Sequence, residues 1–133
     1  MRIILIKGWL IMYSYEFDCY ERAVRTHGEG HDSSIINCYV HLGLSKAKQC
    51  RCAKSTKQVY IRMLNTLEEV ICDTLLPHKW RQHSFRVSKQ LLPVVYEMLS
   101  AQDYQLLNGR LKAVAHYFLE SKMKNKSHSD DES

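Results

Sequence analysis

The sequence predicts a small, mainly α-helical protein, and three observations support this fold class. Its 133 residues suit one hydrophobic core, because single domains typically contain about 100–200 residues. In the middle and C-terminal thirds, apolar residues recur every three or four positions, which is the period of one helix face. Little of the chain alternates apolar and polar residues as a strand would. We expect a central helix–turn–helix followed by a helical hairpin.

Residues 1–32 form an N-terminal segment with one apolar run, residues 3–12. Lys7 and Gly8 interrupt the run, and it is shorter than the roughly 20 residues of a membrane-spanning helix. No small-residue cleavage site of a signal peptide follows it. We therefore expect a strand or a short helix that packs on the core, with either Met1 or Met12 as the start. A glycine-containing loop ends the segment.

Residues 33–76 contain three helical signals, of which the first two are short. A serine cap begins a helix that ends near residue 42, and Gly43 suits the left-handed backbone of a helix end. Ser45 then caps a second helix over residues 46–54. The sequence therefore predicts a tight turn at Gly43.

The third helix in this region is longer and begins at Ser55 or Thr56. It ends before Pro77, which cannot continue a helix. Its apolar positions form one buried stripe: Tyr60, Leu64, Leu67, Ile71 and Leu75.

Residues 77–120 predict a helical hairpin. A turn rich in histidine and cations covers residues 78–83, and a helix in two pieces follows because Pro93 interrupts it. Ser100 and Asp103 form an imperfect capping box. The last helix carries a second stripe: Tyr104, Leu107, Leu111, Ala115, Phe118 and Leu119. These helices either dimerise, bind a partner or complete the core of a monomer. The polar tail, residues 121–133, is expected to be disordered.

The net charge of +5 is concentrated in the middle of the chain. No acidic residue occurs between Ser33 and Leu67, and none between Thr74 and Tyr96. The first of these stretches contains six cations: Lys46, Lys48, Arg51, Lys54, Lys57 and Arg62. Cations at this density neutralise phosphates and release counterions, which favours nucleic-acid binding. An acidic protein partner and a merely solvated basic surface are the alternatives.

The residues from Gly43 onward resemble the helix–turn–helix of the sigma-factor region 4 type, found in small bacterial and phage regulators such as fimbrial operon regulators and phage antiterminators. Gly43-Leu44-Ser45 fits the start of that motif, and Cys50 fits its small buried position. Gln49 and Ala53 depart from the pattern, since larger apolar residues are usual there. The anchors of the recognition helix are Tyr60, Leu64 and Leu67, or Val59 and Met63 with Ser55 as the cap.

The resemblance implies how DNA would be bound. Lys46 and Lys48 would contact the phosphate backbone, and Thr56 would cap the recognition helix. Gln58 would read adenine, and Arg62 would read guanine or hold a phosphate. The expected DNA-binding set is Lys46, Lys48, Thr56, Lys57, Gln58, Ile61 and Arg62.

No enzyme motif is present: the sequence has no phosphate-binding glycine loop, nucleophile elbow or paired acidic motif. Five cysteines are an odd number at low density, which favours free thiols in the cytoplasm over a disulfide framework. Histidines and cysteines do cluster, which leaves a small zinc-stabilised module as one alternative: His27, His31, Cys38, His41, Cys50 and Cys52.

The sequence therefore predicts a cytoplasmic regulator of transcription that binds double-stranded DNA, pairs as a homodimer, and needs no cofactor, small-molecule substrate or membrane. The alternative of a different class is a helical modulator that binds an acidic protein partner without binding DNA.

Overall fold

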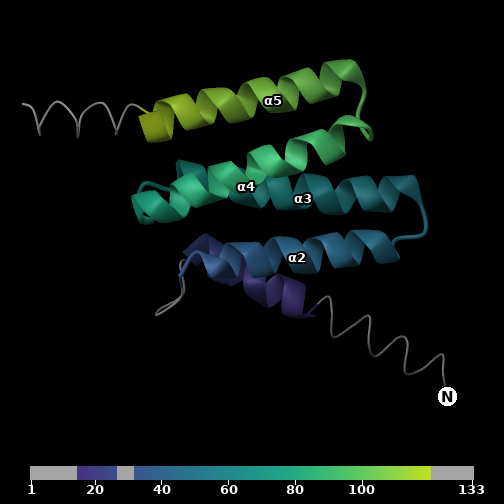
Figure 1. The fold of residues 1–133 in the computed structure, drawn as a ribbon, viewed down its shortest axis with the longest axis horizontal. Coiled ribbons are helices and arrows are strands. Elements are labelled where there is room, and N and C mark those ends of the chain that lie inside the picture. Colours follow the sequence, from purple (N-terminus) through teal and green to yellow (C-terminus); the bar gives the residue numbers. More distant parts are fainter. Residues whose placement is uncertain (1–14, 27–31, 121–133) are drawn as a thin grey trace, which may run out of the picture. The chain divides into compact units, whose positions relative to one another are not determined.

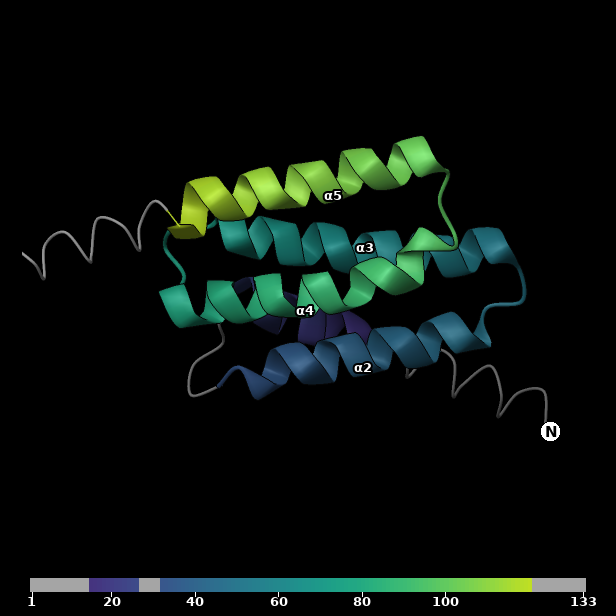
Figure 2. The ribbon, with the colours of Figure 1, turned by 45° about the horizontal axis from the view of Figure 1, so that its top comes forward.

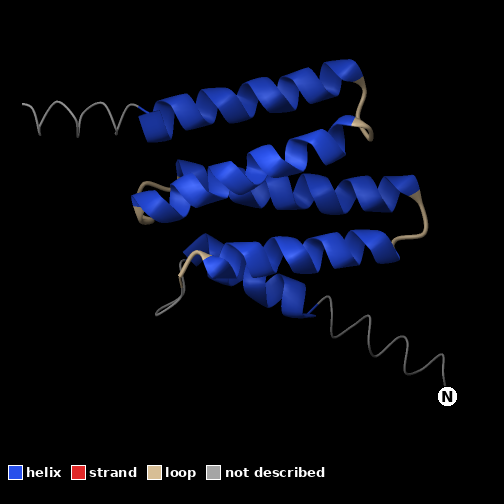
Figure 3. Ribbon diagram, viewed as in Figure 1, coloured by secondary structure: helices blue, strands red, loops and turns tan. Residues whose placement is uncertain are grey.

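Helices make up almost all of the ordered secondary structure. The computed structural model describes residues 15–26 and 32–120, and no strand occurs in those ranges (Figure 3). The expected mainly α class is confirmed. The structure leaves four features of the sequence outside the described residues: the apolar run at residues 3–12, His27, His31 and the polar tail at residues 121–133.

The chain divides into two compact units, residues 1–66 and residues 67–133. The described part of the first unit contains a helix at residues 15–26, α2 (Ser34–Gln49) and the beginning of α3 (Ala53–Cys72). The second contains the end of α3, α4 (His78–Tyr96), α5 (Ala101–Ala115) and the short π-helix η1 (His116–Glu120).

The predicted turn at Gly43 is wrong, because α2 continues through this residue as one helix from Ser34 to Gln49. Gly43 is present for close packing and not for a left-handed helix end. A Cβ atom on this residue would lie 2.1 Å from Sδ of Met63 and 3.0 Å from Cε2 of Phe17. The missing side chain therefore lets α3 and the helix at residues 15–26 approach α2. The separate helix expected over residues 46–54 does not form.

The turn between α2 and α3 lies instead at residues 50–52. Cys50 leaves α2 in an extended conformation, with φ −68° and ψ 137°. The expected cap at Ser55 or Thr56 is also wrong, since α3 begins at Ala53. The Thr56 hydroxyl, inside the first turns of α3, donates to the carbonyl oxygens of Cys52 (3.1 Å) and Ala47 (3.5 Å).

The contacts across this turn describe an antiparallel hairpin. Thr56 meets Ala47 near the turn, and Met63 meets Gly43 farther from it. A DNA-reading helix–turn–helix crosses its two helices at about 90–120° instead. Both anchor registers expected for α3 are buried, at Val59, Tyr60, Met63, Leu64, Leu67 and Ile71. Leu75 is exposed, because α3 ends before it.

In the second unit, α4 is continuous where a turn and two helical pieces were expected. It begins at His78, directly after Pro77, and Pro93 lies inside it. The start of α4 was not recognised from the sequence, because the buried face of the helix includes the polar residues Ser84 and Ser88. The Ser84 hydroxyl donates to the carbonyl of Trp80 at 3.0 Å, and the Ser88 hydroxyl donates to that of Ser84 at 2.8 Å. These bonds allow polar side chains to occupy a buried helix face.

A capped turn joins α4 to α5 at the right of both views, and the two helices contact each other (Figures 1 and 2). The Ser100 side chain accepts the backbone N–H of Asp103, as the expected capping box requires. The second predicted stripe is buried at Leu107, Leu111, Ala115 and Leu119.

Arg81 holds the ends of two elements in the second unit together. Its side chain is fully buried, and its Nε donates to the Ile71 carbonyl at the end of α3 (2.9 Å). Its Nη2 donates to the Phe118 carbonyl in η1 (3.1 Å). Nη1 is buried without a hydrogen-bond partner, which is unusual for a charged group.

Two glycines allow a matched test of the packing in the first unit. Gly43→Ala should lower the free energy of unfolding by about 1–3 kcal/mol, because the added methyl overlaps Met63 in a packed core. Gly109→Ala, in the exposed middle of α5 with nothing within 4 Å, should raise it by up to about 1 kcal/mol through helix propensity. Chemical denaturation measures both, and equal effects of the two substitutions would contradict the close approach at Gly43.

Candidate nucleic-acid interface

Four cations of the first unit lie where α2 and α3 meet. Lys48 lies in the last turn of α2, and Arg51 lies in the turn between the helices. Lys54 and Lys57 lie in the first two turns of α3. We call these four residues the basic tip. Lys48, Arg51 and Lys54 are exposed and Lys57 is half-buried. Because these residues lie in the turn or in the helix turns beside it, they share one end of the hairpin.

The dipoles of the two helices act differently on these cations. Lys46 and Lys48 occupy the last turn of α2, where positive side chains are favourable. Lys54 and Lys57 occupy the N-terminal turns of α3, where the helix dipole is itself positive, and no acidic residue accompanies them. The start of α3 would fold more easily without these two lysines. Positive charge accumulates there, as it does at binding sites for anions.

Not every residue of the expected set belongs to this surface. Lys46 is half-buried, and its Nζ lies 5.1 Å from the ring centroid of Phe17. Ile61 is half-buried, and the Thr56 hydroxyl bonds to backbone carbonyls. Gln58 is exposed beside Lys57. The structure therefore brings Lys48, Lys57 and Gln58 to the surface near the turn and gives Thr56 contacts within the fold.

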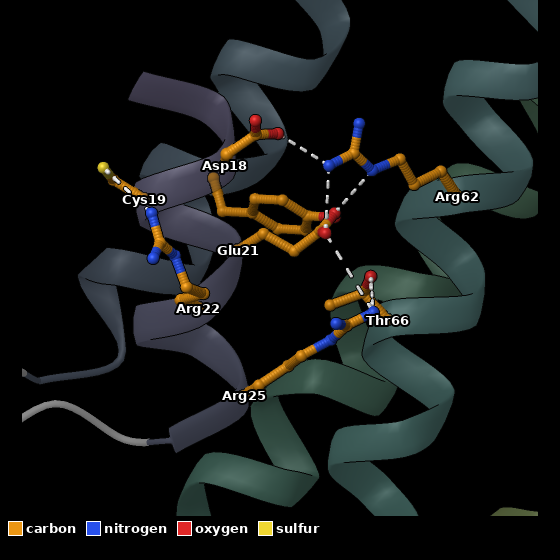
Figure 4. Close-up of polar contacts among 8 residues, drawn as sticks. Asp18, Cys19, Glu21, Arg22, Arg25, Arg62 and Thr66 are labelled. Atoms are coloured by element: carbon orange, nitrogen blue, oxygen red, sulfur yellow. Dashed lines mark hydrogen bonds and ion pairs between the residues drawn. The ribbon is translucent and has the colours of Figure 1, made fainter. Parts of the chain in front are cut away.

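Arg62 departs most from its expected role, because it pairs with acids of the helix at residues 15–26 (Figure 4). Its Nε and Nη2 donate to the two carboxylate oxygens of Glu21 at 3.0 and 3.1 Å. Nη2 also donates to Asp18 at 2.7 Å, and the guanidinium lies 4.8 Å from the centroid of the Phe17 ring. Fork-to-fork pairs of this kind are among the stronger ion pairs. The expectation that Arg62 reads a base is therefore not supported by its position.

Glu21 is the buried centre of this network, with a side chain only 9% exposed. Besides Arg62, it accepts a 2.6 Å hydrogen bond from the hydroxyl of Tyr39 on α2. Arg25, on the same helix as Glu21, donates to the Thr66 hydroxyl of α3 at 3.4 Å. Burial, and then the hydrogen bond to Glu21, raise the pKa of Tyr39 well above its usual range. The phenol therefore remains a donor to the carboxylate.

Sequence reasoning missed this network because residues 1–32 were treated as a segment apart. One signal was available: Phe17, Glu21 and Val24 are spaced by four and three, which is one face of a helix. All three are buried. An acid within an otherwise apolar face indicates a buried charge that needs a cation, and the nearest acid-free stretch supplies Arg62.

The cysteine and histidine cluster does not assemble into a metal site among the residues that the structure describes. Cys38 and His41 are exposed and line an open groove of about 480 Å³ with Glu16, Tyr20, Asn37 and Leu42. Within residues 15–26 and 32–120, no three His, Cys, Asp or Glu side chains are grouped so that they could hold a metal ion.

No protein-family model matches the chain, and no curated protein and no solved structure matches it at a significant level. Among the helices of the described ranges, none combines the length and the apolar character that crossing a membrane requires. A function is therefore proposed below from the charge and geometry of the chain's own residues.

Arg62→Ala tests whether this cation stabilises the fold. It should lower the free energy of unfolding by about 2 kcal/mol, because it removes the bidentate partner of the buried Glu21 carboxylate and leaves Arg25, whose Nη2 lies 4.0 Å from Oε1, as the nearby cation. The effect stays below that of a fully buried pair, since the Arg62 side chain is 41% exposed. Asp18→Asn and Lys57→Ala are the controls, each expected below about 1 kcal/mol. Denaturant titration measures all three, and an Arg62→Ala protein as stable as Lys57→Ala would refute the structural role.

Tyr39→Phe tests the hydrogen bond to Glu21 through its pH dependence. At neutral pH the substitution should lower the free energy of unfolding by about 1–2 kcal/mol. In the unfolded chain the phenol loses its proton near pH 10, whereas in the folded chain it stays protonated to higher pH. The stability from Tyr39 is therefore complete below about pH 10 and declines above it. The difference between wild type and Tyr39→Phe should shrink between pH 9 and pH 11, and a constant difference would count against the burial of the hydroxyl.

Proposed function

We propose that this protein binds double-stranded DNA through the basic tip and acts as a small regulator of transcription without enzymatic activity. The observation that supports the proposal most is the placement of Lys54 in the first turn of α3 and of Lys57 directly after it, with no acidic residue in that first turn. Side chains at that position oppose the helix dipole, so their presence is explained better by an anionic ligand than by stability.

The basic tip suits contacts with a phosphate backbone. Four cations on adjacent turns can each neutralise a phosphate, and the acid-free stretch from Ser33 to Leu67 offers no competing carboxylate. In this proposal Gln58, which is exposed beside Lys57, is the side chain in reach of a base edge. Arg62 has a structural role in this proposal, because it pairs with Asp18 and Glu21.

The proposed setting follows from the same residues. All five cysteines are free thiols, which fits the reducing cytoplasm, where a DNA-binding protein of a bacterial cell or phage would act. Pairing of two copies would let two half-sites be read together. The second unit has individually exposed apolar side chains that could take part in such pairing: Val94, Tyr96, Leu106 and Tyr117.

Fluorescence anisotropy with a labelled DNA duplex in a salt series tests the proposal. With four phosphate contacts, the logarithm of the binding constant should fall against the logarithm of salt concentration with a slope of about −3 to −4. Lys54→Ala with Lys57→Ala should weaken binding to every duplex sequence and reduce the magnitude of that slope by about 2. Sedimentation of the same samples gives the stoichiometry.

Lys112→Ala is the matched control, because this lysine is exposed on α5 and does not belong to the basic tip. It should leave both affinity and slope unchanged. Absence of duplex binding at low salt would defeat the proposal. If polyglutamate then bound through the same lysines, the alternative of an acidic protein partner would replace it.

A further inference from the structure

Cys52 occupies the position that caps the N-terminus of α3. Its Sγ accepts the backbone N–H of Ser55 at 3.4 Å and lies 3.1 Å from the Ser55 hydroxyl. Its backbone carbonyl accepts the N–H of Thr56 at 3.2 Å. The sulfur therefore takes the place that a Ser or Asp oxygen usually fills at a helix start.

The surroundings of Cys52 stabilise its thiolate form. The hydrogen bond from the Ser55 hydroxyl, and then that from the Ser55 N–H, lower the pKa of this exposed cysteine. Arg51 and Lys54 are its sequence neighbours, and the basic tip contains no acid. A thiolate at a helix N-terminus among cations is the usual environment of oxidation-sensitive cysteines.

A second cysteine, Cys50, lies two residues before Cys52, at the α2 side of the turn. Cys50 is half-buried, and its Sγ donates to the Lys46 carbonyl at the end of α2, at 3.4 Å. Cα atoms two residues apart cannot be separated by more than about 7 Å, and disulfides usually join Cα atoms about 4.4–6.8 Å apart. Oxidation-sensing cysteines commonly have such a resolving partner nearby. Thiol exchange between the two therefore requires movement only within the turn.

We propose that Cys50 and Cys52 form a peroxide-sensitive dithiol that switches the basic tip between two shapes. The Cys52 thiolate attacks hydrogen peroxide, the O–O bond breaks, and the products are a Cys52 sulfenic acid and hydroxide. The Cys50 sulfur then attacks the Cys52 sulfur, the S–O bond breaks, and water leaves as the disulfide forms. Peroxide is the two-electron oxidant, and the two thiols together are oxidised.

The disulfide would change the surface that we propose for DNA binding. Sγ of Cys50 would have no proton to donate to the Lys46 carbonyl, and Sγ of Cys52 would lose the negative charge that makes it a strong acceptor for Ser55. One contact would be lost at the end of α2 and one weakened at the start of α3, and the spacing of Lys48, Arg51 and Lys54 would change with them. This effect on DNA rests on the proposed function, whereas the thiol chemistry does not.

Mass spectrometry of the full-length protein after treatment with equimolar hydrogen peroxide tests the chemistry. The peptide that contains Cys50 and Cys52 should lose the mass of two hydrogen atoms before any other cysteine is oxidised. Cys50→Ser should leave Cys52 as a sulfenic acid that dimedone traps, and Cys52→Ser should abolish oxidation at the turn. Oxidation elsewhere first, or a disulfide between two chains in place of the internal one, would overturn the proposal.

Cys38 is the matched control, because it is also exposed but lies inside α2. At pH 6.5, iodoacetamide should alkylate Cys52 at least several-fold faster than Cys38, and Ser55→Ala should reduce this advantage. Equal rates in the wild type would refute the activation of Cys52.

Duplex binding by reduced and oxidised protein separates this inference from the proposed function. A several-fold loss of affinity on oxidation, restored by dithiothreitol and absent in Cys50→Ser, supports the switch. Unchanged affinity despite complete formation of the disulfide overturns it. If the reduced protein does not bind DNA, the proposed function is wrong. The mass spectrometry and alkylation data would still show whether Cys50 and Cys52 form a peroxide-sensitive dithiol.

Discussion

A carboxylate buried among helices needs a cation and hydrogen-bond donors, and Glu21 obtains both from two other helices. Arg62 on α3 supplies a guanidinium, and Tyr39 on α2 supplies a hydroxyl. Since each donor comes from a different element, the ion pair defines how the helix at residues 15–26 meets α2 and α3 within the first unit. Removing Arg62 would leave the buried carboxylate with the Arg25 guanidinium, 4.0 Å away, as its nearby cation, so breaking the pair is expected to be costly.

The same interaction separates the cations of this region into two groups. Arg62 pairs within the fold, and Lys46 lies over the Phe17 ring, so the charge of these residues is used internally. The basic tip keeps its charge at the surface, on two helix ends that the hairpin turn brings together. A single acid-free stretch of sequence therefore contains both a structural cation and a candidate phosphate-binding surface.

Much of the fold could be predicted from the sequence, because apolar spacing is a local property. The helical class and the two buried stripes follow from this spacing. The serine cap of α5 follows from another local pattern, the capping box of Ser100 and Asp103. The continuity of α2 through Gly43 and of α4 through Ser84 could not be predicted. From sequence alone Gly suggests a helix end and Ser suggests a helix cap, whereas the roles of these two residues depend on their neighbours in the fold. Gly43 accommodates Met63 from another helix, and Ser84 and Ser88 bond to carbonyls one turn earlier.

The candidate site was predictable only in its charge. The run of cations is visible in the sequence, but which of them are paired depends on acids about 40 residues away. Asp18 and Glu21 lie far from Arg62 along the chain and meet it only in the folded first unit. The Ser55 contacts of Cys52 likewise depend on where α3 begins, and the expected cap had been placed on the wrong residue.

The buried guanidinium of Arg81 has a consequence for how much of the chain the second unit requires. Its two acceptors, the carbonyls of Ile71 and Phe118, lie before α4 and after α5. A guanidinium keeps its proton at any physiological pH, so it cannot escape burial by becoming neutral. A chain shortened at Ala115 would leave this charge with one acceptor inside an apolar environment. The π-helical turn after α5 is thus an integral part of the second unit's core, and the boundary of that unit must be drawn beyond it.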